Sequence, residues 1–272
     1  MGEIIACANQ KGGVGKTTTV VSLASYLALA GLRTLIVDLD PQGNATSGAG
    51  LDKATIDHSI YGALVDGALV ADLITPTAIT NLSIVPSSRD LSGAEVELVP
   101  VAGRERRLAA ALDPIVLDYD YLLLDCPPSF GLITVNALTA ADSVLIPIQC
   151  EYYALEGLTQ LLATVDLVRS HLNPALQLKG VVLTMFDART TLSADVSHEV
   201  RRHMGDSVFQ SVVPRSVRLA EAPSYGRPIA LYSPASRGAQ AYSDLAAELL
   251  ARDGRTNGAT GIGSTAPAWV TR

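Results

Sequence analysis

Short runs of apolar residues alternate along the chain with segments in which apolar residues recur at helical spacing. Several runs are apolar throughout, which is typical of strands that are covered on both faces of a sheet. The alternation of such strands with helices predicts βαβ units, and therefore an α/β fold with a mainly parallel, twisted sheet and helices on both faces. The predicted strands are residues 3–8, 34–38, 82–85, 121–125, 143–147, 178–185 and 208–213.

Helices are expected between these strands. The first, at residues 17–30, has apolar side chains along one face and is followed by Gly31, a typical helix stop. The other predicted helices are residues 104–112, 133–140, 155–170, 194–204 and 237–250.

Composition divides the chain into one large domain and a tail. Of the 272 residues, 48% are hydrophobic and 17% are charged, which excludes a mainly disordered chain and allows a large core. From Asp253 onward the composition changes to Gly, Thr, Ala and Ser. We therefore expect a domain over residues 1–252 and a flexible C-terminal tail over residues 253–272. Trp269 in this tail is either part of a solvated end or an anchor for a partner.

The strongest chemical signal is QKGGVGKTT at residues 10–18, between the first predicted strand and the first predicted helix. In this context a glycine-rich loop binds phosphate, because its N–H groups can turn toward phosphate oxygens and the helix N-terminus favours negative charge. This predicts a P-loop NTPase that uses ATP and Mg²⁺. Lys16 would neutralise the β- and γ-phosphates, and the Thr17 hydroxyl would bind Mg²⁺. The predicted ATP-binding residues of the loop are Lys11, Gly12, Gly13, Val14, Gly15, Lys16, Thr17 and Thr18.

Three carboxylates follow strands that should end beside this loop. Asp38 and Asp40 close the second predicted strand, and their alternation places both toward the edge where nucleotides bind parallel sheets. A carboxylate there can orient an attacking water molecule and organise Mg²⁺, although capping of the local backbone is the alternative for either residue. Asp125 ends a run of four apolar residues, as expected for a Walker B strand. The predicted metal-binding residues are therefore Thr17, Asp38 and Asp125.

The loop departs from the plain P-loop pattern, because Gln10 replaces the first glycine and Lys11 is an additional lysine. KGGVGKT resembles the deviant Walker A loop of the ParA/MinD family of P-loop ATPases. DLDPQGNATSG, DCPPSFGLITVNALTAADSVLIPIQCEYYALEGL and VPRSVRLAEAPSYGRPI resemble the chromosomal ParA (Soj) branch, and the resemblance covers about residues 1–250. In this family the additional lysine contacts the nucleotide of the other subunit, which implies an ATP-dependent homodimer.

The family resemblance also implies roles for single residues. It assigns the positioning of the attacking water to Asp40, in the Walker A′ motif, so that Lys11, Lys16 and Asp40 become the predicted catalytic residues. It places the adenine near Met185 and Pro214. A chromosome-partitioning ATPase of this branch binds double-stranded DNA without sequence preference as an ATP-bound dimer, and a ParB-type centromere-binding protein stimulates hydrolysis and release.

The net charge of −7 argues against a nucleic-acid partner, but the charge is unevenly distributed. Residues 1–135 carry 8 basic and 15 acidic side chains, whereas residues 136–272 carry 12 of each. Residues 189–237 contain seven arginines, four acidic residues and no lysine, a balance of +3 that suits contact with phosphate. The resemblance points to Arg189 and Arg218 as the DNA-binding positions, and a solvated surface with local ion pairs is the alternative.

Other proteins with this loop need sequence features that this chain does not show clearly. A MinD-type membrane ATPase needs a basic amphipathic C-terminal helix, which the Gly- and Pro-containing tail does not suggest. An iron–sulfur reductase needs two converging cysteines per subunit, and only Cys126 lies suitably, beside Asp125. Metabolic P-loop ligases share only the loop.

The cysteines and the hydropathy of the chain bear on its location in the cell. Cys7, Cys126 and Cys150 form no metal-binding spacing, and no membrane span or membrane partner is expected. The expected location is the cytoplasm, in association with the nucleoid. The sequence leaves open whether the cargo is a chromosome or a plasmid, which ParB-type protein is the partner, and whether a replication initiator is also regulated.

Overall fold

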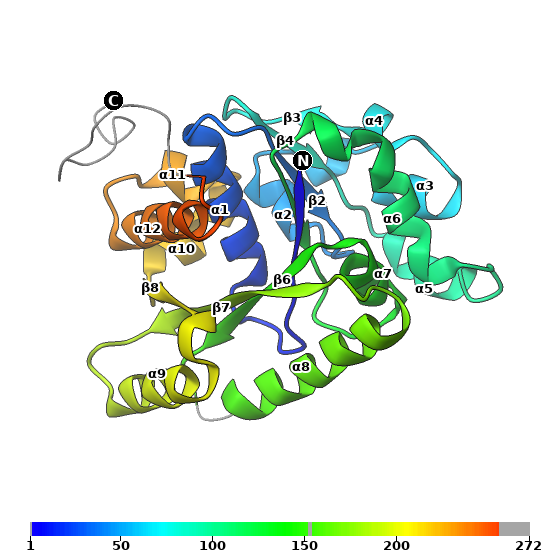
Figure 1. Ribbon diagram of the computed structural model, residues 1–272. Coiled ribbons are helices and arrows are strands. Elements are labelled where there is room, and N and C mark those ends of the chain that lie inside the picture. The colour runs from blue at the N-terminus through cyan, green and yellow to red at the C-terminus, as the bar shows by residue number, and fades with distance from the viewer. Residues whose placement is uncertain (1, 152–153, 256–272) are drawn as a thin grey trace.

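The computed structural model describes residues 2–151 and 154–255, and Figure 1 shows their arrangement. An eight-stranded sheet with the order β3-β4-β2-β5-β1-β6-β7-β8 forms the centre. All neighbouring strands are parallel except β3, which pairs antiparallel with β4. The strands are β1 Glu3–Cys7, β2 Thr34–Asp38, β3 Thr75–Pro76, β4 Leu82–Val85, β5 Tyr121–Asp125, β6 Ser143–Gln149, β7 Gln177–Phe186 and β8 Val208–Pro214.

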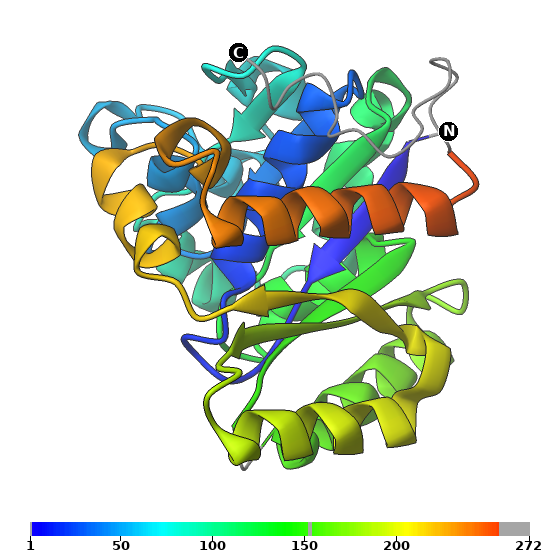
Figure 2. The ribbon, with the colours of Figure 1, turned by 90° about the vertical axis from the view of Figure 1, so that its left-hand side faces the viewer.

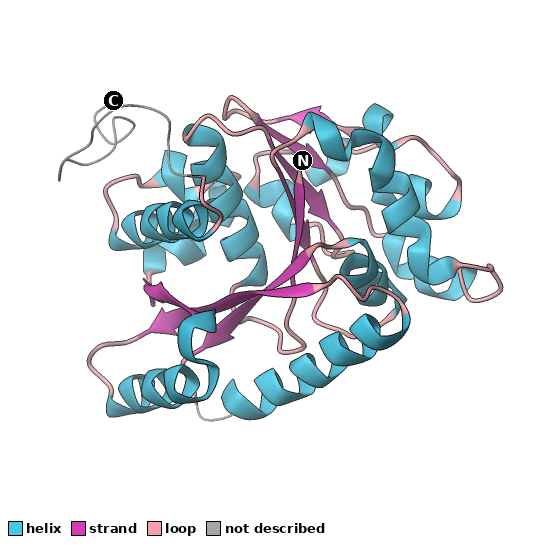
Figure 3. Ribbon diagram, viewed as in Figure 1, coloured by secondary structure: helices cyan, strands magenta, loops and turns pink. Residues whose placement is uncertain are grey.

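Helices cover both faces of the sheet (Figure 3), which confirms the predicted α/β class. One face buries side chains of α1 Lys16–Leu29, α2 Asn44–Gly48, α10 Val217–Glu221, α11 Ile229–Tyr232 and α12 Arg237–Arg252. The other face buries side chains of α3 Ile60–Val65, α4 Val70–Leu73, α5 Leu91–Glu97, α6 Arg107–Leu112, α7 Leu132–Ala140, α8 Ala154–His171 and α9 Thr191–Met204. Short 3₁₀ turns are η1 Lys53–Thr55, η2 Arg104–Arg106, η3 Asp113–Asp118, η4 Gly205–Ser207 and η5 Ala222–Tyr225.

Helix α1 is more deeply buried than its one-sided apolar pattern predicts. Thr19 and Ser25 on its other side are also fully buried. The reason is that α12 packs across α1 (Figure 2), so that α1 lies between the sheet and the last helix. The Thr19 and Tyr242 hydroxyls, 3.0 Å apart, form a hydrogen bond across this contact.

The end of α12 is held at the amino edge of the sheet by a nearly buried group of charges. The Lys179 ammonium on β7 lies 2.8 Å from the Glu3 carboxylate and 2.5 Å from the Asp253 carboxylate. The Tyr121 hydroxyl donates to Asp253 at 2.6 Å. Asp253, which composition groups with the tail, is therefore packed against the domain, and residues 256–272 of the predicted tail lie outside the described residues.

Candidate nucleotide site

Residues 8–15 connect β1 to α1 at the carboxyl edge of the sheet. Gly13 and Gly15 have φ values of 76° and 89°, a left-handed conformation that glycine adopts without steric cost. Gly15 precedes α1 directly, and no side chain among the described residues caps that helix. The N–H groups of the first turn are therefore left to bind an anion, as a phosphate-binding loop requires.

Contacts within the domain hold the loop in this conformation. The Thr184 hydroxyl on β7 donates to the Val14 carbonyl at 2.8 Å. The Lys16 ammonium donates to the Lys11 carbonyl at 3.2 Å, and Lys16 is only 7% exposed. The Lys16 side chain thus lies across the loop, where it would face the phosphates of a bound nucleotide.

The two aspartates after β2 have different surroundings. Asp38 is fully buried, and its carboxylate accepts hydrogen bonds from the Thr46 N–H and hydroxyl at 2.7 Å each and from the Asp40 N–H at 3.1 Å. Asp40 accepts one hydrogen bond, from the Gln42 N–H at 2.9 Å, and its second oxygen has no partner among the described residues. Asp38 thereby fixes the backbone of Asp40 and the start of α2, whereas Asp40 keeps an oxygen for a water molecule.

Asp125 is a buried carboxylate without hydrogen-bond partners in the described part of the chain. It lies opposite Asp38 on the neighbouring parallel strand, with the Thr17 and Lys16 side chains near it. Burial, followed by the negative charge of Asp38, raises the pKa of Asp125 well above its usual value. A buried, unpartnered carboxylate of this kind fits a nearby cation.

These surroundings are suited to Mg²⁺ bound together with a nucleotide. The described residues contain no cluster of three or more His, Cys, Asp or Glu side chains that could hold a metal ion by themselves. Mg²⁺ commonly takes one or two protein ligands and completes its shell with water and phosphate oxygens. Thr17 and Asp125 could supply such ligands, while the oxygens of Asp38 are engaged by Thr46 and Asp40.

The second lysine of the loop lies away from this centre. The Lys11 ammonium forms an ion pair with Glu151 at 2.8 Å, and both side chains are almost half exposed. The Lys11 backbone is held by the Asn9 side chain, whose amide group bonds the Pro147 carbonyl. The two lysines of the loop thus point in different directions. The Lys16 side chain is folded into the loop, and the Lys11 side chain lies at the surface.

Arg189 and Arg218 line one groove of about 550 Å³ at the carboxyl ends of β7 and β8. The groove also contains Pro214, one of the two residues predicted near adenine. Met185, the other, is at the end of β7 and has a φ of 51°, which is uncommon for a residue with a side chain and often found at functional sites.

The arginines of this groove differ in a way that the sequence could not show. Arg189 forms a two-pronged ion pair with Asp187 at 2.8 and 2.9 Å, and Arg218 pairs with Glu221 at 3.0 Å. Arg189 lowers the pKa of Asp187 far below its usual value. The side chains of two further groove residues, Arg215 and Arg237, have no ion-pair or hydrogen-bond partner among the described residues.

Other candidates from the sequence do not form a second site. Cys7, Cys126 and Cys150 are buried and unpaired. Burial raises the pKa of all three thiols, which disfavours the thiolate form. Among residues 2–151 and 154–255, none of the helices combines the length and the apolar composition that a membrane span requires.

Known proteins resemble this chain over most of its length. A family model described as an AAA domain matches residues 2–178. The sporulation initiation inhibitor protein Soj of Bacillus subtilis is 58% identical over 251 residues, which cover 92% of this chain and 99% of the relative. The chromosome partitioning protein ParA of Myxococcus xanthus is 54% identical over 253 residues, covering 93% and 89% of the two chains.

Solved structures share the fold. A Mycobacterium smegmatis protein named cobyrinic acid a,c-diamide synthase, solved with ADP and magnesium, has a TM-score of 0.82 and 38% identity, covering 93% of this chain and 96% of that chain. The McdA(D38A)–ATP complex from Cyanothece has a TM-score of 0.83 at 22% identity, covering 92% and 96%, and shows the same fold.

Proposed function

The chain belongs to the family of ParA and Soj chromosome-partitioning ATPases, and from this premise we propose that its ATP-bound dimer holds DNA until hydrolysis releases it. The observation that carries the proposal is that the two lysines of the loop have different positions. Lys16 is buried within the loop, whereas Lys11 reaches out to Glu151 at the surface. A surface lysine at the edge of the nucleotide site can serve a second subunit, which an ordinary P-loop has no means to do.

Nucleotide binding uses the loop and the buried carboxylate. The N–H groups of residues 12–18 and the Lys16 ammonium bind the phosphates, and the side chains of Met185 and Pro214 contact the adenine. Thr17 and Asp125 hold Mg²⁺, which neutralises the charge that develops on the phosphate oxygens during transfer. Asp38 acts through Asp40, because its hydrogen bonds fix the backbone from which Asp40 projects.

Hydrolysis requires a water molecule placed in line with the bond that breaks. The available oxygen of Asp40 accepts a hydrogen bond from this water and directs its lone pair to the γ-phosphorus. A bond forms between the water oxygen and phosphorus, the bond to the β,γ-bridging oxygen breaks, and the proton that the water loses passes to an oxygen of the phosphate product. Lys16 stabilises the negative charge that moves toward the leaving ADP.

Dimerisation exchanges the partner of Lys11. In the single subunit the ammonium is paired with Glu151, and in the dimer it contacts the phosphates bound by the other subunit. An exposed ion pair contributes at most about 1 kcal/mol, so its loss does not oppose the exchange strongly. Two facing triphosphates need this added positive charge, and dimer formation therefore depends on bound ATP.

DNA binding uses the arginine groove. The described groove brings Arg189, Arg215, Arg218 and Arg237 together on one surface, and a dimer presents two such surfaces. Guanidinium groups contact phosphates without reading bases, so binding is independent of sequence and sensitive to salt. A ParB-type protein then stimulates hydrolysis, after which the separated subunits bind DNA weakly.

The test compares DNA retention with ATP, ADP and no nucleotide across a series of salt concentrations. Retention should require ATP and fall steeply as salt increases. Lys11→Arg serves as a control that keeps the charge, next to Lys11→Ala, which removes it. DNA binding that is equal in all three nucleotide states would refute the proposed cycle, and so would ATP-dependent dimerisation of Lys11→Ala at the wild-type level.

A further inference from the structure

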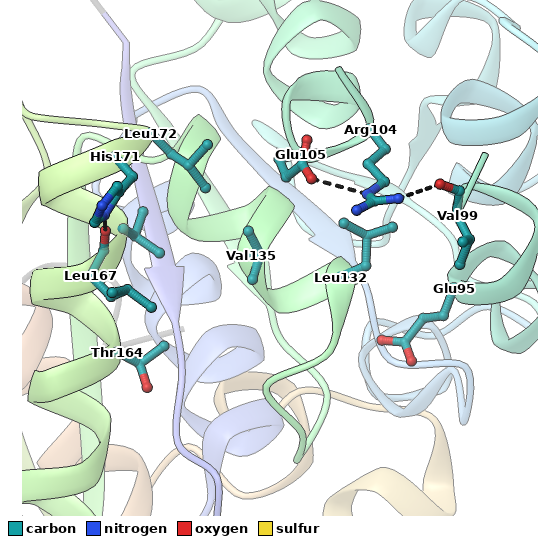
Figure 4. A pocket seen from close by; sticks show the side chains of 11 residues that line it. Glu95, Val99, Arg104, Glu105, Leu132, Val135, Thr164, Leu167, His171 and Leu172 are labelled. Carbon is teal, nitrogen blue, oxygen red and sulfur yellow. Dashed lines mark hydrogen bonds and ion pairs between the residues drawn. The ribbon is translucent and has the colours of Figure 1, made fainter. Parts of the chain in front are cut away.

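An apolar groove of about 690 Å³ lies away from the nucleotide site, on the face of the sheet opposite α1. Figure 4 shows α8 on one side, with Leu167 and His171, and the segment of Val99 and Arg104 on the other. Val135 of α7 lies between them. Leu167 is 63% exposed and Val99 is 58% exposed, although both are large apolar residues. These exposed apolar side chains and the hollow between them can receive an apolar side chain of another segment.

We propose that residues 256–272 of the same chain bind in this groove, with Trp269 as the anchor. The segment begins with a Gly-rich stretch, TNGATGIG, and continues to the apolar APAWV at residues 266–270. Trp269 is the only tryptophan in the 272 residues. A Gly-rich stretch followed by one large aromatic residue is a suitable composition for docking a segment onto its own domain.

The groove lies within reach of this segment. Asp253 is bound to Lys179, and Leu172 at the end of the groove precedes Lys179 by seven residues, a path of at most about 25 Å. The fourteen residues from Arg255 to Trp269 can extend about 46–50 Å.

The tether also reduces the affinity that docking needs. A connection within one chain raises the effective concentration of the segment at the groove, so that weak intrinsic binding is sufficient to fill it.

The charges that line the groove also favour residues 256–272 as the segment that binds there. Glu95 lines it and has no ion-pair partner among the described residues, whereas Glu105 is paired with Arg104. Between residues 256 and 272 the only charged side chain is Arg272, three residues after Trp269. A bound Trp269 would bring this guanidinium to the vicinity of the unpaired Glu95 carboxylate, and no acidic residue of the segment would be repelled by it.

Because the chain has one tryptophan, fluorescence that is excited selectively over that of the nine tyrosines reports on Trp269 alone. We would measure the emission maximum and acrylamide quenching in the full-length protein and in Leu167→Glu, which places a charge on the groove. Leu117→Glu is the matched control, since Leu117 on η3 is 67% exposed and does not line the groove. Circular dichroism would verify folding, and Val99→Glu would replace Leu167→Glu if that variant did not fold.

The proposal predicts that Trp269 emits at shorter wavelength and is quenched several-fold less readily in the wild type and in Leu117→Glu than in Leu167→Glu. Quenching equal to that of the urea-unfolded chain, or unchanged by Leu167→Glu, would overturn it and leave the groove to a separate protein. Protection that increases with protein concentration would also overturn it, because the occupant would then be a second copy. The outcome is independent of the proposed DNA cycle.

Discussion

Replacement of Arg215 and Arg237 by alanine tests the arginine groove most directly. Both side chains line the groove and form no direct ion pair in the described part of the chain, so neither has to break such a contact to neutralise a DNA phosphate, although the charge of Arg215 also acts on Asp187. The two positions that family resemblance selects, Arg189 and Arg218, are already paired. The unpaired arginines should therefore carry a large share of the salt-dependent binding.

The expected magnitude follows from the number of phosphate contacts. Each contact contributes about 0.9 to the slope of the logarithm of the binding constant against the logarithm of the salt concentration. A dimer presents each arginine twice, so that a single variant should reduce the slope by about 1.8 and the double variant by about 3.6. Between 50 and 200 mM salt, a change of about 3.6 in slope corresponds to roughly a hundredfold difference in how far affinity falls.

The assay is a titration of fluorescent double-stranded DNA with ATP-bound protein at several salt concentrations. Arg169→Ala is the control, because Arg169 on α8 is similarly exposed but pairs with Asp166 outside the groove. Its slope should equal that of the wild type. If the double variant of Arg215 and Arg237 keeps the wild-type slope while it still dimerises with ATP, the groove is not the DNA surface.

Other predictions concern stability and turnover. Lys179→Met should destabilise the fold by about 3 kcal/mol, because it leaves two nearly buried carboxylates without their ion-pair partner. Arg33→Met, at an exposed ion pair, should cost under about 1 kcal/mol. Urea unfolding measures both losses of stability, and equal losses would contradict the prediction. Asp40→Ala should form an ATP-dependent DNA complex that does not dissociate, and rapid phosphate release by this variant would remove Asp40 from its role. Lys11→Ala should bind ATP as a monomer, as sedimentation would show. Burial raises the pKa of Asp38 to about 6, so folding takes up a proton there and stability should fall as pH rises from about 4 to 6. Asp38→Asn should lack this part of the pH dependence.

The order of strands and long helices could be predicted from the sequence because each is a local pattern. The strands at residues 34–38, 82–85 and 121–125 have the predicted bounds. The short helices α2 and α10, of five residues each, are not predicted, because so few residues show no periodicity. What holds α2 is the hydrogen bonding of Thr46 by Asp38, which is a contact between elements rather than a local preference.

The main residues of the site could also be predicted, because they follow local sequence patterns. The loop and Asp125 stand at fixed offsets from strand ends, and the parallel sheet brings those ends together. The state of each side chain could not be foreseen. Alternation places Asp38 and Asp40 alike, yet three hydrogen bonds engage Asp38, and Asp40 keeps one oxygen available. The assignment of Asp38 as a metal ligand stays a prediction, and the hydrogen bonds that Asp38 accepts do not favour it.

The position of α12 across α1 also determines when a newly synthesised chain can become active. The central strand β1 pairs with β5 and β6, the loop is supported by Thr184, and α1 packs against α2, α11 and α12, the last of which ends the domain. At about 5–20 residues per second, the ribosome needs roughly 12–50 s to pass from the first strand to the end of α12. Throughout that time the phosphate-binding segment has emerged but has no complete scaffold, so the chain should not bind ATP before synthesis of the domain is finished.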